Sequence, residues 1–366
     1  ERNLVGLQSK NMSYVLLVVA PRAALLHRLL GEAIRKVRLN ESSHYARRRS
    51  METTQQKASV AGARISQLME KVTFRLTLGY YTMKARQWAS ATPMTKRAAI
   101  RLVQRLIPKR PLGGRTASRV SSDPVDASRL LDRDGFVRLG RIIDQPVIDE
   151  LIAYTDSQLA VDPWNPQRPK FDRRRPPPDA HTAQFFRRAL LGSNRVLELA
   201  NDPRVLEIAR RYLGATPTLS DLNAWWSFPG PRKPKEAQLF HRDRDDLRFC
   251  KLMVYLTDVD MTTGPHVYVR GSNSDDRLLV ARRHSDEEVE QTFGKDRIEY
   301  FCEPAGTAFF VDTGGMHKGL LPTHGERLIL EIHYSLMPIG RERYSKDPKV
   351  ELAPGYDAYV NRLIAR

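Results

Sequence analysis

The feature that most limits what this chain can fold into is a series of short apolar segments in its C-terminal half. The clearest of them, residues 249–256, is apolar at every position but one, as expected of a strand that is covered on both faces. Residues 267–269, 307–311 and 328–336 are similar, and glycine-containing turns separate the segments. Many short strands at close spacing predict a sandwich or a closed jelly roll.

Helical patterns precede most of these strands. Apolar residues recur at helical spacing in residues 147–158 and 205–213. Helices of this kind would cover one face of a sheet. Together the patterns predict an α+β fold, in which a jelly roll carries covering helices.

Composition divides the chain into two parts. Residues 108–128 are rich in proline and glycine and almost free of large apolar residues, which is typical of a linker. We therefore predict two domains, 1–117 and 118–366. The net charge of +18 belongs to residues 1–130, which hold 25 Lys and Arg against 7 Asp and Glu, whereas residues 131–366 hold 35 of each. Such an asymmetry bears on partners and not on the fold.

The N-terminal region is predicted to be helical and basic. Apolar residues recur at helical spacing in residues 25–37, 65–76 and 95–107, with Lys and Arg between them. These helices could pack on one another or on the next domain and leave solvated basic faces. They could also contact an anionic surface, which would be a membrane or a nucleic acid. Peripheral membrane contact through residues 1–117 is therefore one expectation.

Cysteine content and hydropathy bear on the compartment. No apolar run reaches the roughly 20 residues that a membrane-spanning helix needs, and two cysteines do not make a disulfide framework. We expect a reducing compartment, most simply the cytoplasm, with peripheral attachment to a membrane as an option. Cys250 and Cys302 are both expected to be core residues in strands.

An H-x-D tripeptide made by His241 and Asp243 is the central motif. Residues two apart in an extended chain project to the same side, so an imidazole and a carboxylate would be presented together. His317 follows the predicted strand 307–311 and a glycine-rich turn, which would bring it to the rim of a sheet. Two histidines and one carboxylate form the facial triad of non-haem iron(II) oxygenases, which leaves coordination positions open. We predict that His241, Asp243 and His317 bind iron.

Arg327 adds a second signal. It lies ten residues after His317, at the start of the predicted strand 328–336, and a return strand would bring it back beside the metal. A buried guanidinium can bind a carboxylate through two parallel hydrogen bonds, which is what the far end of 2-oxoglutarate requires. Each signal is weak alone, but their combination predicts a 2-oxoglutarate-dependent dioxygenase.

These motifs and their surroundings resemble the phytanoyl-CoA dioxygenase family over roughly residues 130–340. The stretches that carry the resemblance are Asp134-Gly135-Phe136-Val137, His241-Arg242-Asp243, Tyr255-Leu256-Thr257-Asp258-Val259-Asp260, Gly264-Pro265, Gly271-Ser272 and Asp312-Thr313-Gly314-Gly315-Met316-His317-Lys318-Gly319. The resemblance implies a double-stranded β-helix, iron(II), 2-oxoglutarate and dioxygen, and hydroxylation coupled to release of succinate and carbon dioxide. Asn273 departs from the family, which often has His after Gly-Ser, but this position is not a ligand.

By the same resemblance, His241, Asp243 and His317 are the iron ligands and Arg327 binds the cosubstrate. Related halogenases lack the carboxylate, so the presence of Asp243 favours hydroxylation or another oxidation. The basic N-terminal region has no counterpart in the family core.

Weaker site candidates lie on predicted strands. Asn223 occupies a place where related enzymes often contact the cosubstrate, so we predict that role for it. Alternation from Arg327 would place Glu331 and His333 on the same face. They would line the pocket, form a buried hydrogen-bonded pair, since buried polar groups normally find partners, or lie at an exposed strand end.

Other polar residues are not expected to act in catalysis. His266, His284 and His324 fall in predicted turns or polar stretches. The proline-rich stretch 162–179 is expected to be an irregular loop that is either a lid or a solvated surface. Its residues Arg173-Arg174-Arg175 suggest an anionic group on the substrate, although a solvated loop explains them equally well.

Three functions are therefore compared. The first is a hydroxylase that acts on a small-molecule or carrier-bound metabolite. The second is an oxygenase that acts on nucleic acid through the basic arm, which is unfavoured because the catalytic half is neutral and lacks interleaved basic and aromatic residues. The third is a non-catalytic β-barrel binding protein, against which the intact triad and Arg327 argue.

Overall fold

The structure is a computed structural model that describes residues 93–110, 112, 117–230, 233–340, 342, 344 and 350–364. The chain divides into two compact units, Glu1–Thr82 and Met83–Arg366, and all described residues belong to the second. The predicted helices 25–37 and 65–76 lie outside the described residues. None of the described helices combines the length and the hydropathy that a membrane span requires.

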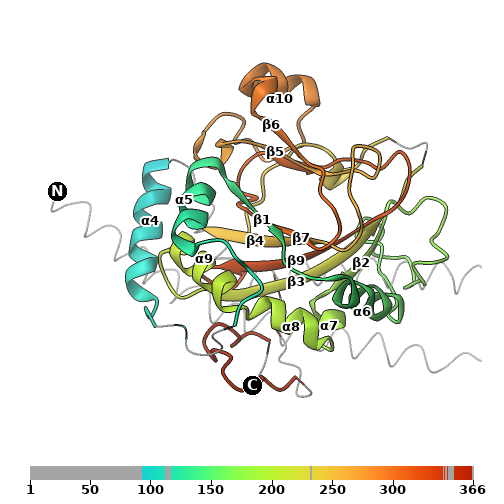
Figure 1. Ribbon diagram of the computed structural model, residues 1–366. Coiled ribbons are helices and arrows are strands. Elements are labelled where there is room, and N and C mark those ends of the chain that lie inside the picture. The colour runs from blue at the N-terminus through green and yellow to red at the C-terminus, as the bar shows by residue number, and fades with distance from the viewer. Residues whose placement is uncertain are drawn as a thin grey trace, which may run out of the picture. The chain divides into compact units, whose positions relative to one another are not determined.

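Two antiparallel sheets form the body of the domain (Figure 1). The larger sheet has the order β1-β7-β4-β9-β3-β2 and the smaller one the order β6-β5-β8. The strands are β1 Phe136–Arg141, β2 Thr182–Phe186, β3 Thr218–Ser227, β4 Phe249–Tyr255, β5 His266–Val269, β6 Ile298–Phe301, β7 Thr307–Val311, β8 His317–Gly319 and β9 Arg327–Ser335. The arrangement agrees with the predicted jelly roll.

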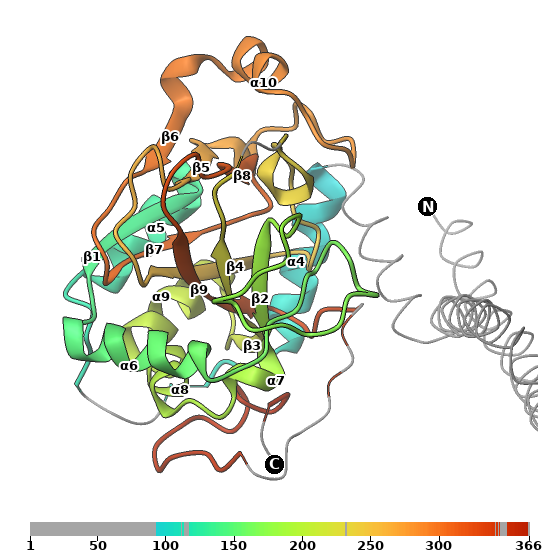
Figure 2. The same cartoon turned by 90° about the vertical axis from the view of Figure 1, so that its right-hand side faces the viewer.

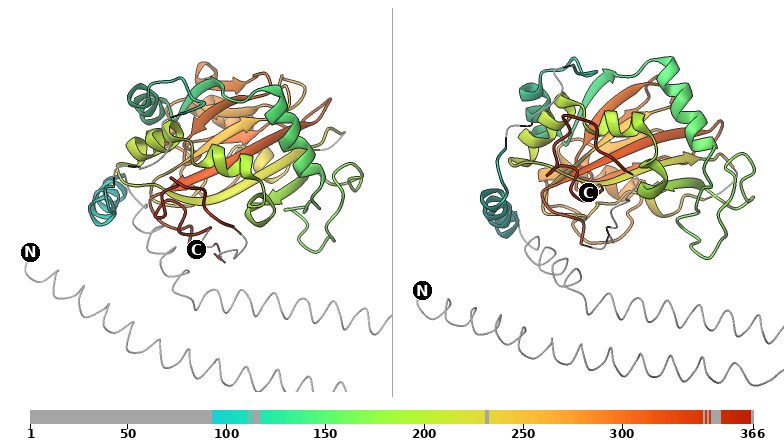
Figure 3. Two further views of the ribbon diagram at one scale, coloured as in Figure 1. Left: turned by 60° about the horizontal axis from the view of Figure 1, so that its bottom comes forward. Right: turned by 90° about the horizontal axis from the view of Figure 1, so that it is seen from below.

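Helices cover the outer face of the larger sheet, as Figures 2 and 3 show. They are α5 Pro124–Asp134, α6 Gln145–Asp156, α7 Arg187–Leu190, α8 Asn194–Ala200 and α9 Pro203–Leu213. Leu252 and Ile332 of the sheet belong to one apolar cluster with Leu131 and Ile208 of these helices. This cluster is the main hydrophobic core. Burial of its apolar side chains supplies the dominant favourable term in folding.

Two smaller apolar clusters hold the other layers together. Between the sheets, Met253 and Phe309 of the larger sheet pack with Tyr268 and Phe301 of the smaller one. On the far side of the smaller sheet, a third cluster includes Phe293 of α10 Asp286–Phe293. Three short 3-10 helices, η1 Glu236–Gln238, η2 Ser272–Ser274 and η3 Lys295–Arg297, lie in the connections. Apolar side chains therefore pack against both faces of the smaller sheet.

Strand register decides which side chains enter the space between the sheets. Strand β9 pairs with both β3 and β4, so that Arg327 lies opposite Ser227, and Glu331 lies opposite Asn223 and Met253. Directly opposite residues in an antiparallel pair project to the same face. The alternation predicted from Arg327 is therefore present in β9, and Glu331 shares the inner face.

The predicted linker 108–128 is too long at its C-terminal end, because helix α5 already begins at Pro124. Asp123 is its N-cap, and the carboxylate accepts hydrogen bonds from the backbone of Val125 at 2.8 Å and of Asp126 at 3.1 Å. Proline is favoured at the first position of a helix, where its missing N–H costs nothing. Pro124, one of the prolines that suggested a linker, is therefore the first residue of helix α5.

The third predicted N-terminal helix corresponds to α4 Pro93–Leu106. Ile100 joins the main core. The amide of Gln104 donates to the carbonyl of Leu213 at 2.6 Å, and the backbone N–H of Arg110 donates to Thr216 at 3.1 Å. The sequence left open whether this helix packs on the next domain or contacts a membrane or a nucleic acid. The structure shows it packed on the next domain. The predicted division between residues 117 and 118 remains a prediction.

Candidate metal centre

The three predicted metal ligands lie together. The backbones of His241 and His317 pair through N–H···O distances of 2.9 and 3.0 Å, and the N–H of Asp243 donates to the carbonyl of Thr313 at 2.8 Å. Nε2 of His241 lies 3.5 Å from Oδ1 of Asp243, and Nε2 of His317 lies 3.7 Å from Oδ2. One ligand atom from each side chain falls within 4.8 Å of the others. The donor set and its spacing therefore fit a facially coordinated metal ion.

Hydrogen bonds orient both imidazoles. Nδ1 of His241 lies 2.9 Å from the carbonyl of Leu239, and Nδ1 of His317 lies 3.0 Å from the carbonyl of Gly315. A ring nitrogen that faces a carbonyl carries the proton, so Nε2 keeps its lone pair for the metal. Burial, and then the neighbouring His241, lower the pKa of His317 to about 3. The His317 ring is therefore neutral, as a metal ligand must be.

The carboxylate of Asp243 is held in its ionised form. Burial alone would raise its pKa, but the ammonium group of Lys251 holds that pKa well below its usual range. Nζ of Lys251 donates to Oδ2 of Asp243 at 2.9 Å. The third predicted ligand is therefore a carboxylate that is paired with a buried cation.

Lys251 is a residue of this site that sequence reasoning missed. It lies on β4, its side chain is 9% exposed, and its ammonium group also faces Asp245 at 3.6 Å and Glu331 at 3.3 Å. These three carboxylates raise its pKa above the ordinary lysine value, although burial acts in the opposite direction. One signal in the sequence could have revealed it: Lys251 is the single charged residue in an otherwise apolar strand. A lysine that is buried in this way needs carboxylates as partners.

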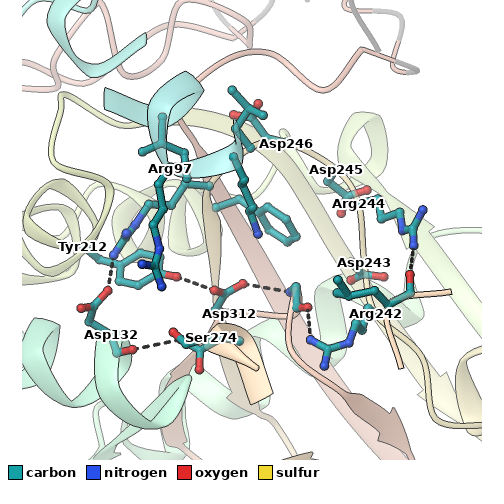
Figure 4. A pocket seen from close by; sticks show the side chains of 18 of the residues that line it. Arg97, Asp132, Tyr212, Arg242, Asp243, Arg244, Asp245, Asp246, Ser274 and Asp312 are labelled. Atoms are coloured by element: carbon teal, nitrogen blue, oxygen red, sulfur yellow. Dashed lines mark hydrogen bonds and ion pairs between the residues drawn. The ribbon is translucent and has the colours of Figure 1, made fainter. Parts of the chain in front are cut away.

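The glycine-rich turn before His317 is clamped by two tyrosines. The hydroxyl of Tyr212 on α9 donates to Oδ2 of Asp312 at 2.5 Å, as Figure 4 shows, and that of Tyr268 on β5 donates to the Asp312 carbonyl at 2.8 Å. A Cβ atom at Gly315 would lie 1.8 Å from the Tyr268 hydroxyl. Glycine is therefore required there, and the tight packing fixes where His317 emerges.

Arg327 lies inside the jelly roll and is 3% exposed. One of its terminal nitrogens donates to the carbonyl of Gly264, and the other donates to the hydroxyl of Ser227 at 3.0 Å. Its Nε is buried and has no hydrogen-bond partner among the described residues. Because buried polar atoms normally have partners, this unmatched donor fits a carboxylate ligand such as the far end of 2-oxoglutarate.

Asn223 lies on the same inner face but beside Glu331, not beside Arg327. Its amide donates to Glu331 at 3.2 Å and to Asp221 at 3.1 Å, and its Oδ1 accepts from Gln184 at 3.3 Å. Glu331 is 7% exposed, and burial raises its pKa in spite of Lys251. Of the outcomes weighed for this pair, burial holds for both Glu331 and His333, and the hydrogen bond of Glu331 is with Asn223. A cosubstrate role for Asn223 remains a prediction.

The remaining histidines differ in environment. His266 does not fall in a turn as predicted but begins β5, where it is 6% exposed. His284 is buried with Nδ1 3.0 Å from Glu288. His324 is exposed in a turn. Periodicity alone did not reveal that His266 enters the interior, because β5 has only four residues.

Two other sequence predictions change in the structure. Cys250 is buried as expected, but Cys302 is exposed just after β6, so it is not a core residue. Arg173 forms an ion pair with Asp156 at 2.5 Å and stacks over the ring of Trp226. This arginine therefore holds the predicted irregular loop 162–179 against the domain.

A cavity of about 440 Å³ opens beside Asp243 (Figure 4). Helices α4 and α9 and the segments 242–249 and 273–279 form its walls. Most of its lining side chains are charged, including Lys96, Arg97, Arg244, Asp245, Asp246 and Asp276. Asp243 is thus the one predicted metal ligand that lines this strongly polar space.

Comparison with solved structures finds distant likenesses. HygX from Streptomyces hygroscopicus, with nickel and 2-oxoglutarate bound, is 17% identical with a TM-score of 0.45, over 66% of this chain and 98% of that chain. EctD from S. alaskensis, with bound iron, is 18% identical with a TM-score of 0.44, over 71% and 98%. SnoK, a non-haem α-ketoglutarate-dependent carbocyclase from nogalamycin biosynthesis, is 17% identical with a TM-score of 0.45, over 60% and 87%. Likenesses this remote do not by themselves assign an activity.

Comparison with families gives the assignment. No curated protein sequence matches the chain. The model of the phytanoyl-CoA dioxygenase family matches residues 131–320, more than half of the 366 residues. The matched range contains His241, Asp243 and His317, although Arg327 lies beyond it. The chain therefore belongs to the phytanoyl-CoA dioxygenase family and is an iron- and 2-oxoglutarate-dependent oxygenase.

Proposed function

We propose that this enzyme hydroxylates a small-molecule or carrier-bound metabolite, with release of succinate and carbon dioxide. The observation that carries the proposal is the joint presence of the three ligand side chains within 4.8 Å and a buried arginine with an unmatched Nε. When bound, iron(II) with 2-oxoglutarate and dioxygen supplies the oxidant that inserts one oxygen atom into a C–H bond of the substrate. His241, Asp243 and His317 would hold the metal, and Arg327 would bind the far carboxylate of the cosubstrate.

The protein's own residues supply the orientation. The carbonyls of Leu239 and Gly315 aim the histidine Nε2 atoms, and Lys251 holds Asp243. Preorganised groups of this kind lower the cost of ordering at the reacting centre. Between the sheets, buried aromatic side chains such as Tyr255 and Phe309 form an apolar cluster, which would help to exclude water from the reacting centre.

The cavity beside Asp243 supports a hydrophilic substrate. Its volume of about 440 Å³ lies within the ordinary range for small-molecule sites. An acyl chain would find few apolar partners on a wall of carboxylates and guanidinium groups, whereas hydroxyl, amino or carboxylate groups would find many. A polar metabolite, free or attached to a carrier, is therefore the substrate class that we propose.

Reconstitution tests this function. The protein is loaded anaerobically with iron(II) and 2-oxoglutarate, exposed to oxygen and screened against polar metabolites, with succinate as the readout. We expect succinate release that is lost in His241→Ala. If iron-loaded wild type released no more succinate than His241→Ala, with or without metabolites, the proposal would be wrong.

The rival functions have direct tests. Oxygenation of nucleic acid would require the protein to shift a DNA or RNA probe at low salt, where phosphate contacts are strongest. A non-catalytic β-barrel binding protein would show no iron-dependent turnover of 2-oxoglutarate. A probe shift is not expected, because the catalytic half has no net charge. Absence of turnover is not expected, because the described domain carries the three predicted ligands and Arg327.

We also propose that the basic region 1–117 makes peripheral contact with anionic membranes. The support is its charge, because nearly all of the excess of Lys and Arg lies there, and basic amphipathic helices bind anionic lipid. Flotation of the full chain with phosphatidylserine vesicles tests this idea. Binding should fall as salt rises, and absence of flotation at low salt would rule the contact out.

A further inference from the structure

His266 is held rigidly inside the jelly roll. Its backbone N–H donates to the hydroxyl of Tyr255 at 2.9 Å. The imidazole lies nearly parallel to that of His317, with a centroid distance of 5.6 Å and an interplanar angle of 28°. Phe301 and Phe309 pack around it at centroid distances of 5.4 and 5.6 Å. The ring therefore has one place to occupy, next to a predicted metal ligand.

Nε2 of His266 has no hydrogen-bond partner among the described residues, although the atom is buried. Leaving a buried polar atom unpaired is costly, and the great majority of such atoms have partners. Nε of Arg327 is buried and unmatched in the same way. Arg327 also donates to the carbonyl of Gly264, which lies two residues before His266 and ties β9 to the start of β5. Nε2 of His266 and Nε of Arg327 are thus two unmatched nitrogen atoms on neighbouring segments inside the jelly roll.

We infer that His266 is a further cosubstrate-binding residue, which donates a hydrogen bond from Nε2 to an oxygen of 2-oxoglutarate. The inference rests on the proposed function, in which the cosubstrate extends from the metal to Arg327. His266 contacts His317 at the metal end of this path and follows the segment that Arg327 contacts at the other. An oxygen-rich dianion placed there would satisfy both unmatched nitrogens.

The donor capacity of His266 suits this role. A neutral imidazole carries one N–H donor, so it can bind a carboxylate without adding a second buried cation beside Arg327. Burying another cation there would be costly without a partner.

Anaerobic titration of the iron(II)-loaded protein with 2-oxoglutarate tests the inference. The readouts are the metal-to-ligand charge-transfer absorption and the heat of binding, so no turnover is needed. His266→Phe keeps the aromatic packing and removes the donor, whereas His266→Gln keeps a donor. We expect the Kd for 2-oxoglutarate to rise about tenfold or more in His266→Phe, as loss of a hydrogen bond to a charged group implies. In His266→Gln it should stay within about threefold of wild type.

Controls separate this role from packing and from the proposed function. His284→Phe removes another buried imidazole whose Nε2 is unmatched, but outside the proposed cosubstrate path, and should leave the Kd unchanged. The affinity for iron(II) should be unaltered in all variants. If His266→Phe does not fold, His266→Leu provides the same comparison.

Each outcome decides the matter. Equal affinities in wild type and His266→Phe, or equal losses in His266→Phe and His266→Gln, would overturn the inference and leave the proposed function intact. If wild type loaded with iron(II) bound no 2-oxoglutarate, both the proposed function and the inference would fall. A selective loss in the apolar variants, rescued by glutamine, supports the assigned hydrogen bond.

Discussion

The ammonium group of Lys251 lies 2.9 Å from Oδ2 of Asp243, inside a sheet whose other buried side chains are mostly apolar. The same nitrogen faces Glu331 at 3.3 Å and Asp245 at 3.6 Å. One cation thus compensates three buried or half-buried carboxylates, one of which is a predicted metal ligand. In the metal-free protein, the ammonium group of Lys251 is therefore the cation that forms a hydrogen bond with the Asp243 carboxylate.

Replacement of Lys251 by methionine should destabilise the metal-free protein by about 3–5 kcal/mol, because it leaves buried carboxylates without their cation. Urea unfolding of the metal-free protein measures the loss, and bound iron(II) should restore part of it. Lys318→Met is the matched control, since Lys318 pairs with Asp286, whose side chain is 51% exposed. Equal losses in the two variants would contradict this account.

Removal of the Arg327 guanidinium should abolish tight binding of 2-oxoglutarate. Arg327→Leu removes two or more charge-assisted hydrogen bonds, so we expect the Kd to rise about 100-fold or more. Arg327→Lys should recover only part of the affinity, because an ammonium group does not bind a carboxylate through two parallel bonds. Calorimetric titration of the iron-loaded variants gives the Kd. An unchanged Kd in Arg327→Leu would place the cosubstrate elsewhere.

Neutralisation of the carboxylate ligand should weaken metal binding. Asp243→Asn keeps the shape of the side chain but removes its charge, so the affinity for iron(II) should fall by more than the roughly 10- to 100-fold typical of residues that only support ligands. Asp245→Asn is the control, because Asp245 is buried two residues away and faces the same Lys251 but is outside the ligand group. Anaerobic competition with a chelator measures both, and similar effects would argue against Asp243 as a ligand.

Loss of the Tyr212 hydroxyl should loosen the turn that carries His317. Tyr212→Phe leaves Oδ2 of Asp312 without its 2.5 Å partner, which should lower the free energy of unfolding by about 1–3 kcal/mol. It should also weaken iron(II) binding, since Asp312 begins the turn. Tyr154→Phe removes a comparable hydrogen bond to the carbonyl of Ala189, away from the site. We expect that control to affect stability but not iron affinity, and the opposite result would disprove the clamp.

Several elements could be predicted from sequence because their signals are local. Strand β7 has the predicted bounds, and β4 and β9 differ from prediction by one residue at their ends. Long apolar runs indicate burial on both faces regardless of what covers them. Strands β2, β6 and β8 are as short as β7 or shorter, but they mix polar with apolar residues, so no apolar run marks them. Tertiary pairing stabilises such strands, so they were not predicted.

The metal ligands and Arg327 were also accessible to the sequence, because the H-x-D spacing, the glycine turn and the return strand constrain geometry within short stretches of chain. The partners of buried polar groups were not accessible. Tyr212 reaches Asp312 across 100 residues, and Arg327 reaches Ser227 across the same separation.

The sequence by itself therefore determined the family and the confinement of the basic excess to the N-terminal third, and it predicted the three residues that the structure brings together as candidate ligands. Only the tertiary structure decided that Lys251 neutralises Asp243, that His266 enters the interior, and that α4 packs on the domain. The physical reason is that local patterns report whether a residue is buried. The identity of its polar partner depends on strand register and on contacts between distant segments.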